Sequence, residues 1–268
     1  MGAPIGSQMF PALLRYWRTR RGFSQLELAL EADVSARHVS FLESARARPS
    51  EEMVLRLLTA MNVPLRDQNA ALAAAGFASR FPNDAAEEIA PELEMALDQM
   101  MRQHDPFPLA VLAVDGKIVR QNRGASSLFR AFIDEAPSTA PANMYALLFD
   151  PMGLRPFVTE WESFARNLVA RLHREQLARG DARLTTVLDT ILAQPGVSDD
   201  WRQPDFSAAL PPALHLELAK GDLRVRFLVA ITTFATAQHV ALDELRIESC
   251  FPLDARTRET CTRLAASE

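Results

Sequence analysis

The sequence predicts an α+β protein built from two different parts. Residues 11–75 contain five short helical segments separated by turn residues, which predicts an all-α five-helix domain over residues 1–80. From residue 109 onward, segments that alternate apolar and polar side chains stand among further helical segments, so an antiparallel sheet with a helical insertion is expected within 91–268. A polar stretch over residues 79–90 separates the two parts.

Composition narrows the classes of protein to which this chain can belong. Of its 268 residues, 48% are hydrophobic and 24% charged, as in an ordinary globular protein, and that length suits two domains. No run approaches the roughly 18 apolar residues of a membrane span, and no secretory signal is apparent. Cys250 and Cys261 are too few for a disulfide framework and lack metal-ligand spacing. A reduced, cytoplasmic protein with no membrane partner and no metal site is expected.

The first helices carry clear start and stop signals. A helix over Pro11–Arg21 ends at Gly22, a residue suited to the left-handed conformation after a helix. Ser24 and Glu27 form a capping-box pattern in which each side chain bonds the other residue's amide. The second helix is therefore expected over Gln25–Ala32.

The next segment predicts a helix-turn-helix. A turn at Asp33-Val34 precedes Ser35, the expected N-cap of a third helix ending near Ser44. Ala29 is small enough for close helix contact, and Asp33 is among the few residue types that tolerate positive φ. A shared core is expected from Leu28, Val34, Val39 and Leu42, and further helices over Glu51–Ala60 and Pro64–Gly76.

The exposed face of the third helix is expected to carry Ala36, Arg37, His38, Ser40 and Phe41. In helix-turn-helix proteins the N-terminal residues of this helix face base edges in the major groove of DNA. Charge agrees in sign, since residues 1–80 carry +3 and the remainder −8 of the net −5, although a difference of that size decides nothing alone.

Several motifs in this region resemble the XRE (Cro/C1-type) helix-turn-helix family: Ser24-Gln25, Val34-Ser35 and Arg46-x-x-Pro49-Ser50. The longer string Ser35–Ser50, together with Val63-Pro64-Leu65 and Ala74-Ala-Gly-Phe77, resembles the MmyB-like subgroup. Asp33 and Ala45 depart from that pattern, because the family usually has Gly there. Ala45 would cost about 1 kcal/mol if it adopts positive φ.

The resemblance implies a double-stranded DNA operator as partner and assigns contacts to residues. Gln25, at a helix N-terminus, would bind a phosphate, and Arg37 would bond guanine in bidentate fashion. His38 and Ser40 would touch base edges or backbone, with Arg46 and Arg48 on phosphates. The full set of expected DNA-contacting residues is Gln25, Ser35, Ala36, Arg37, His38, Ser40, Arg46 and Arg48. The alternative for each arginine is a solvated surface residue, and Phe41 is read as core.

The second part mixes helices and strands. The helical segments expected are Pro91–Gln103, Asn122–Phe132, a 20-residue amphipathic segment carrying Phe157, Trp161, Phe164, Leu168 and Leu172, and Ala182–Ala193. The strands expected are Leu109–Val114, which turns through a two-residue Asp115-Gly116 hairpin into Lys117–Gln121, and then His215–Ala219, Leu223–Thr233 and Leu245–Phe251.

This order of elements resembles a PAS-like sheet with a helical insertion. Asn143–Pro151 followed by Glu160-Trp161-Glu162 also resembles the MmyB-like ligand-binding domain, over about residues 91–254. The resemblance implies a sensor of a small apolar molecule, such as a fatty acid, in a cavity over one sheet face. The expected ligand-binding residues are Phe129, Met144, Phe149, Arg155, Trp161, Phe164, Phe227 and Val229.

For the apolar residues of this set, a plain core position is the alternative and the favoured interpretation. The Trp161 indole N–H would cap a ligand head group, while Arg155 or Arg226 would pair with a carboxylate. Catalysis is not expected, because five histidines are scattered and no phosphate loop, nucleophile elbow or metal motif is present. Cys250 is expected to be buried core and not a redox sensor.

The expected function is that of a homodimeric regulator that binds a pseudo-palindromic operator under control of a ligand, without a required cofactor. Two alternatives remain open. The C-terminal domain could serve only for dimerisation or protein interaction, or an enzyme could be fused to a DNA-binding domain.

Overall fold

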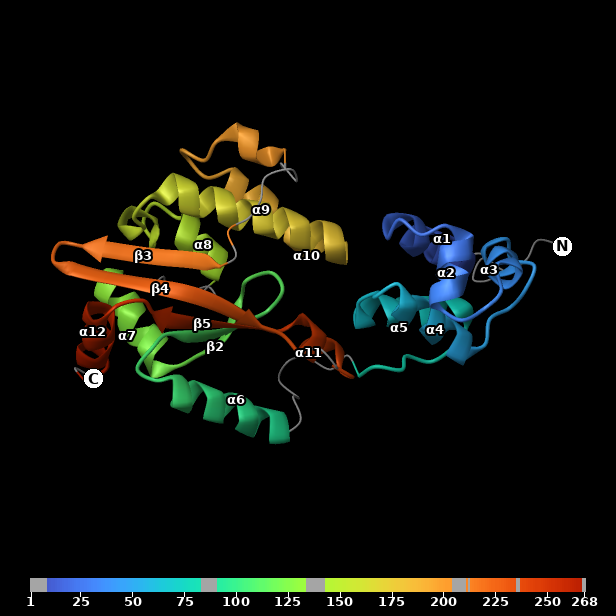
Figure 1. Ribbon diagram of the computed structural model, residues 1–268, viewed down its shortest axis with the longest axis horizontal. Coiled ribbons are helices and arrows are strands. Elements are labelled where there is room, and N and C mark those ends of the chain that lie inside the picture. The colour runs from blue at the N-terminus through green and yellow to red at the C-terminus, as the bar shows by residue number, and fades with distance from the viewer. Residues whose placement is uncertain are drawn as a thin grey trace. The chain divides into compact units, whose positions relative to one another are not determined.

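The computed structural model describes residues 9–82, 91–133, 143–203, 211, 213–234 and 237–266. It has the α+β class that the sequence predicts, with helices followed by a five-stranded sheet and further helices (Figure 1). Two compact units are present: residues 1–88 with 235–243, and residues 89–234 with 244–268. The amide of Val240 bonds the carbonyl of Pro82 at 3.0 Å within the first unit. The sequence-based division at 1–80 and 91–268 assigns this short returning segment to the second domain.

The first unit contains the five predicted helices in order. They are α1 Met9–Arg20, α2 Gln25–Glu31, α3 Ala36–Glu43, α4 Glu51–Ala60 and α5 Leu65–Ala75. The α2 capping box is confirmed, and Ser35 and Ser50 cap α3 and α4 through their hydroxyl oxygens. The helices enclose one apolar core, whose fully buried residues include Leu14, Leu28, Val39, Leu42, Leu57 and Leu72.

Three turns of this unit use non-glycine residues at positive φ. Asp33 has a φ of 51°, Ala45 of 58° and Asn62 of 50°. Asp33 and Ala45 therefore adopt the positive φ for which the family usually has glycine, and the turns keep their geometry. It costs conformational energy, because an L side chain crowds the backbone in this region.

The second unit holds an antiparallel sheet in the order β2-β1-β5-β4-β3. Its strands are β1 Leu109–Leu112, β2 Ile118–Gln121, β3 Leu214–Lys220, β4 Leu223–Thr232 and β5 Arg246–Pro252. The expected two-residue hairpin at Asp115-Gly116 is wrong. The amide of Gly116 bonds the carbonyl of Ala113 at 2.9 Å and Gly116 has a φ of 80°, so the loop has three residues and ends in a glycine bulge.

One face of the sheet is mainly apolar, with Glu248 and Arg246 of β5 as charged residues on it. Cross-strand pairing places Leu214 opposite Val229 and Val229 opposite Cys250. Four helices supply the residues that cover this face: α7 Arg123–Phe132, α8 Met144–Phe149, α9 Trp161–Arg179 and α12 Ala255–Ala266. In Figure 1, α8 and α9 lie along β3 and β4. Helix α10, Ala182–Leu192, packs on α9, and short 3-10 turns cover 155–157 and 199–202.

Helix α6, Pro91–His104, covers the opposite face. Its Asp98 pairs with Arg120, which stands beside Val111 in the sheet register. Its last residue, His104, places Nε2 3.0 Å from the carbonyl oxygen of Cys250 in β5. Helix α6 is therefore attached to the edge strand β2 and to the central strand β5.

Asn122 joins the segment after α6 and the start of β1 to α7. Its Oδ1 accepts bonds from the amides of Leu109 and Ala125, both at 2.9 Å, and its Nδ2 donates to the carbonyl of Phe107 at 2.8 Å. The side chain is 5% exposed, so these bonds satisfy a buried amide. Helix α11, Val240–Glu244, precedes β5. Across the residues that can be described, no helix has both the length and the apolar content that spanning a bilayer requires.

Candidate nucleic-acid interface and ligand site

Helices α2 and α3 pack against each other through the residues that a helix-turn-helix requires. Leu28, Ala29, Val39 and Leu42 are all buried, which confirms the predicted contact residues. Ala29 is 1% exposed and its carbonyl accepts the amide of Val34 at 2.8 Å across the turn. This contact fixes α3 against α2 with the opposite face of α3 turned outward.

The outward face of α3 carries the predicted side chains with different exposures. Arg37 is exposed and its guanidinium lies 5.1 Å from the centre of the Phe41 ring. His38 and Ser40 are half-buried, and Ala36 packs against the core. Ser35 is exposed, and its hydroxyl oxygen accepts the amide of His38 at 3.1 Å. Arg37 is therefore the long polar side chain of this face that is most open to solvent.

Beyond α3, Arg46 and Arg48 are both exposed. They follow the Ala45 turn, where the amide of Arg46 bonds the carbonyl of Phe41 at 2.8 Å. Gln25 lies apart from them at the start of α2. Its Nε2 donates to Oε2 of Glu43 at 2.8 Å, so its side chain also serves to join α2 to α3.

Glu43, at the end of α3, is a charged residue in the core that sequence reasoning did not single out. It is 4% exposed, and Arg18 donates to both of its carboxylate oxygens, Nε at 2.6 Å and Nη2 at 3.0 Å. Arg15 bonds its carbonyl at 3.0 Å. Burial would raise the pKa of Glu43, but the hydrogen bonds from Arg18 and Gln25 and the nearby positive charges outweigh burial and lower it.

A signal for this site existed in the sequence. Glu43 follows Leu42 directly and stands four residues after Val39, which places it on the buried side of α3. A carboxylate there needs a cationic partner. The pattern would not have identified Arg18, which lies 25 residues away.

The second unit contains a small apolar cavity of about 50 Å³ between the sheet and α7–α9, more enclosed than the other hollows described below. Four of the eight predicted ligand residues line it: Phe129, Met144, Phe164 and Val229. Phe149 is fully buried and packs elsewhere in the core. The remaining lining comes mainly from β1, β3, β5 and α7, and Glu248 is the one charged residue among the described residues that line it.

Arg155 and Trp161 stack on each other away from this cavity. The Arg155 guanidinium lies 4.8 Å from the Trp161 ring centre and donates to the carbonyl of Pro195. Trp161 meets Phe149 edge-on, with ring centres 5.0 Å apart. Its indole Nε1 is buried and has no acceptor among the described residues.

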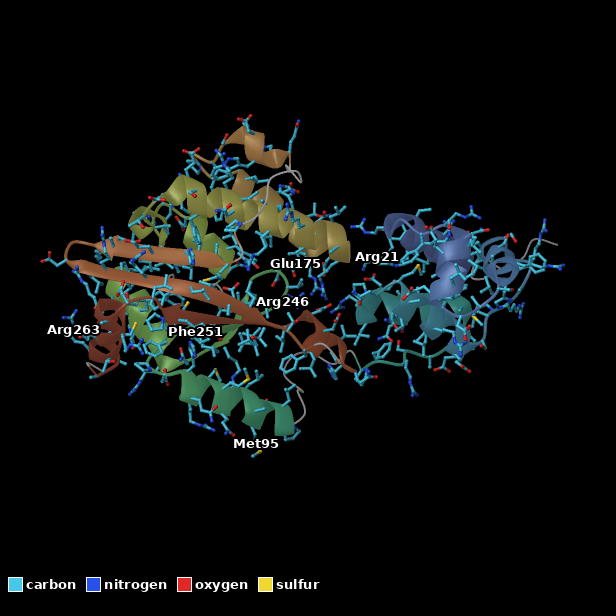
Figure 2. All side chains as sticks on the ribbon, in the orientation of Figure 1. Arg21, Met95, Glu175, Arg246, Phe251 and Arg263 are labelled. Atoms are coloured by element: carbon cyan, nitrogen blue, oxygen red, sulfur yellow. The ribbon has the colours of Figure 1, made fainter. Side chains whose placement is uncertain are left out.

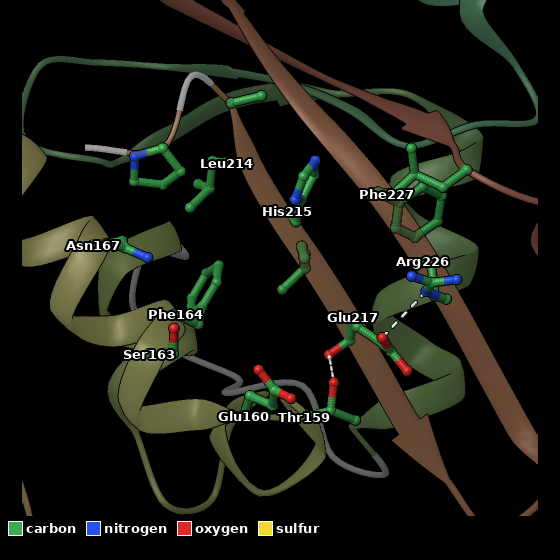
Figure 3. A pocket seen from close by; sticks show the side chains of 14 residues that line it. Thr159, Glu160, Ser163, Phe164, Asn167, Leu214, His215, Glu217, Arg226 and Phe227 are labelled. Atoms are coloured by element: carbon green, nitrogen blue, oxygen red, sulfur yellow. Dashed lines mark hydrogen bonds and ion pairs between the residues drawn. The ribbon is translucent and has the colours of Figure 1, made fainter. Parts of the chain in front are cut away.

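A separate open groove of about 380 Å³ lies beside β3 and the start of α9 (Figure 3). Predicted residues Phe164 and Phe227 line it, but the groove is largely polar. Glu217 is one of its lining residues and has an oxygen 3.2 Å from Nε of Arg226. Since Arg226 also lies 3.8 Å from Asp254, its charge is already compensated.

A third hollow of about 350 Å³ is lined by Asn167, Arg171 and residues of β4, including Val229 and Ile231. Two ion pairs join α9 to β5, and Arg171 of one of them lines this hollow. Arg246 donates to Oε1 of Glu175 from Nε at 3.1 Å and Nη2 at 3.0 Å, and Figure 2 shows both side chains. Arg171 Nη2 lies 3.5 Å from Oε1 of Glu248. Burial raises the pKa of Glu248, with Arg171 acting in the opposite direction.

The comparisons with known proteins match both units. The model of the helix-turn-helix family matches residues 14–68. The model of the MmyB-like transcription regulator ligand binding domain matches residues 93–264. The chain belongs to the MmyB-like transcription regulators. Both predicted resemblances are confirmed, and the regulator combines a DNA-binding helix-turn-helix with a ligand-binding domain.

Comparisons with curated proteins and with solved structures add little evidence about the function of this regulator. No curated protein matches it significantly. Among solved structures it is similar to an RNA-binding light-oxygen-voltage receptor at 13% identity, over 97% of this chain and 64% of that one, with a TM-score of 0.29. That score is too low to support any conclusion about fold or activity.

Metal binding and thiol chemistry find little support among the described residues of the regulator. In the described ranges, no group of three or more His, Cys, Asp or Glu side chains is placed to hold a metal ion. Burial raises the pKa of Cys250, and it raises that of Cys261 to about 11. Thiols with raised pKa values are poor nucleophiles at neutral pH, which favours the predicted core role for Cys250.

Proposed function

We propose that this regulator binds a specific double-stranded DNA operator through the outward face of α3 and responds to a small apolar ligand in its second unit. Arg37 supports the first part most directly. It is exposed on the first turn of α3, the part of a recognition helix that enters the major groove. Arg37 would read a guanine, with His38 and Ser40 nearby and Gln25, Arg46 and Arg48 on phosphates.

The regulator would act as a homodimer in the cytoplasm. Two α3 helices would then reach successive major grooves about 34–36 Å apart on a pseudo-palindromic site. The strand order β2-β1-β5-β4-β3, with helices on the apolar face, supports a PAS-like description of the sensing unit. A ligand can shift DNA binding only by its difference in affinity for two states, tenfold for about 1.4 kcal/mol.

Selection of binding sites from random duplexes by the full-length protein tests the DNA-reading role. One sequence should emerge, and Arg37→Ala should cost about 1–3 kcal/mol at a single base position while other positions keep their preference. Arg56→Ala is the matched control, because Arg56 lies on α4 and pairs with Glu52 on the surface. An unchanged base profile for Arg37→Ala would remove Arg37 from base recognition.

One observation favours the alternative that the second unit acts without a ligand. The small apolar cavity holds only about 50 Å³, so a fatty-acid-like chain needs either side-chain movement or the adjoining open hollow. Native mass spectrometry of protein purified from cells separates the two interpretations. A co-purified small molecule supports sensing, whereas an empty dimer supports a dimerisation or protein-interaction module.

A further inference from the structure

Arg171 on α9 is a mostly buried cation whose hydrogen-bonding groups are largely unused. Its side chain is 24% exposed, and its closest ionic contact, to Glu248, is 3.5 Å long. Charge-assisted bonds between such groups are usually about 2.7–2.9 Å. Nε and Nη1 are buried without an acceptor in the part of the chain that the structure describes. Buried donors of a charged group that lack acceptors destabilise a fold.

The neighbouring ion pair shows what a completed site looks like on the same two elements. Arg246 uses Nε and Nη2 on Glu175 and donates from Nη1 to the carbonyl of Leu245 at 2.9 Å. Glu175 stands one turn after Arg171 on α9, and Arg246 stands two residues before Glu248 on β5. The same two elements, α9 and β5, therefore provide acceptors for the donors of Arg246 but not for Nε and Nη1 of Arg171.

The incomplete pair stands where two hollows adjoin. Glu248 lines the small apolar cavity, and Arg171 lines the open hollow of about 350 Å³. Leu214 and Val229 line both. A molecule that enters the open hollow would thus find apolar side chains on one side and the guanidinium on another.

We propose that Arg171 anchors the carboxylate head group of an amphipathic ligand whose aliphatic chain lies against Leu214 and Val229, and that Glu248 is the internal counter-ion with which this head group competes. The inference rests on the proposed ligand-sensing function and names the residue that would confer specificity. The other arginines expected for this role are occupied: Arg155 by Pro195 and Trp161, and Arg226 by Glu217 and Asp254.

Competition with Glu248 follows from the shape of the guanidinium. A carboxylate can bond it at two points along the edge of Nε and Nη2 or along the edge of Nη1 and Nη2. Both edges include Nη2, the nitrogen that faces Glu248. A bound head group must therefore share or take this donor, so removal of the Glu248 charge should strengthen binding.

Calorimetric titration of the full-length protein with octanoate and with 1-octanol tests the assignment, because the two probes share a chain and differ in the head group. Octanoate should bind about tenfold to a hundredfold tighter, the range expected of hydrogen bonds to a charged group. Arg171→Gln should abolish this preference, and Glu248→Gln should tighten octanoate binding without changing octanol binding. Arg166→Gln is the control, on the same helix but 63% exposed, and should leave both affinities unchanged.

Each other outcome overturns the assignment. Equal affinities in the wild type, or a preference that survives in Arg171→Gln, would exclude Arg171 as the anchor while leaving an apolar ligand site in place. Binding of neither probe would overturn both the anchor and the proposed sensing of aliphatic ligands. Because Arg171→Gln leaves Glu248 without its cation, the double variant with Glu248→Gln removes both charges. It should fold, as judged by circular dichroism, and bind the acid and the alcohol equally.

Discussion

Arg18 of α1 holds the carboxylate of Glu43, the last residue of α3, at both oxygens, with Nε 2.6 Å and Nη2 3.0 Å away. Gln25 of α2 donates to the same carboxylate at 2.8 Å. One buried acid therefore ties three helices together at the end of the helix whose other end carries Arg37. The orientation of the exposed face of α3 depends on this contact.

Glu43→Gln should destabilise the first unit by about 3 kcal/mol, because it leaves the Arg18 cation buried without its counter-ion. Urea denaturation followed by segment-resolved hydrogen exchange measures this locally. Glu52→Gln is the control, since Glu52 forms a surface pair with Arg56 and its side chain is 81% exposed. That change should stay within about 0.5 kcal/mol. Equal effects of the two substitutions would contradict the role assigned to Glu43.

The stability of the first unit should also fall in acid through Glu43. Burial opposes the shift, but bonds from Arg18 and Gln25 hold the pKa of Glu43 below its unfolded value of about 4.3. Its stabilisation is therefore complete above the unfolded pKa and is lost as the pH falls through the lower folded pKa. Hydrogen exchange of α2 and α3 peptides from pH 7 to pH 3 should show this loss. A Glu43→Gln protein with the same acid dependence would refute it.

Arg48→Ala should weaken binding to all DNA sequences alike. The side chain is exposed beyond the Ala45 turn and outside α3, where a phosphate contact is expected and a base contact is not. Loss of one phosphate contact lowers the slope of log K against log salt by about 1. Fluorescence anisotropy across a salt series on specific and random duplexes measures both effects. A change confined to one base position would place Arg48 in base recognition instead.

Ala45→Gly should stabilise the first unit by about 1 kcal/mol, because Ala45 adopts a φ of 58° that glycine reaches without a side-chain clash. Ala47→Gly offers the comparison, as Ala47 is not among the residues at positive φ and packs against the core. It should be neutral or destabilising. Thermal denaturation of the two variants distinguishes them, and a lower melting temperature for Ala45→Gly would show that the methyl group contributes packing that outweighs strain.

Trp161→Phe should change the stability of the second unit by less than about 1 kcal/mol despite the loss of ring area. Phenylalanine keeps the edge contact with Phe149 and removes the buried indole Nε1, for which the described residues offer no acceptor. Trp161→Ala should instead cost about 3 kcal/mol by removing the whole contact. Calorimetric unfolding compares them. Similar losses for both would mean that the indole N–H is satisfied in the folded protein.

The helices of the first unit were predictable because their start signals are local. Ser24, Ser35 and Ser50 each accept the amide three residues later, so a short stretch of sequence contains the whole interaction. Strand alternation around Val225 and Phe227 likewise marks the buried face of β4. Alternation does not say which hollow a side chain lines, and Phe227 faces the polar groove instead of the small apolar cavity.

The elements and contacts that escaped prediction lack a local pattern. Helix α12 buries Thr257, Thr260, Cys261 and Ala265, which are small or polar, and therefore shows no apolar stripe. Helix α8 spans six residues that are nearly all apolar, too few to reveal a period. The Arg171–Glu248 contact joins residues far apart in the chain. Only tertiary structure shows that this arginine, and not Arg155 or Arg226, contacts a charged residue that lines the apolar cavity.

Cys250 contacts structure on both faces of the sheet. It lines the apolar cavity, and its carbonyl oxygen lies 3.0 Å from Nε2 of His104 at the end of α6. A ligand that displaced the backbone of β5 at Cys250 would therefore also change the position of this carbonyl oxygen relative to His104. Helix α6, on the other face of the sheet, would then respond to a ligand with which it has no direct contact.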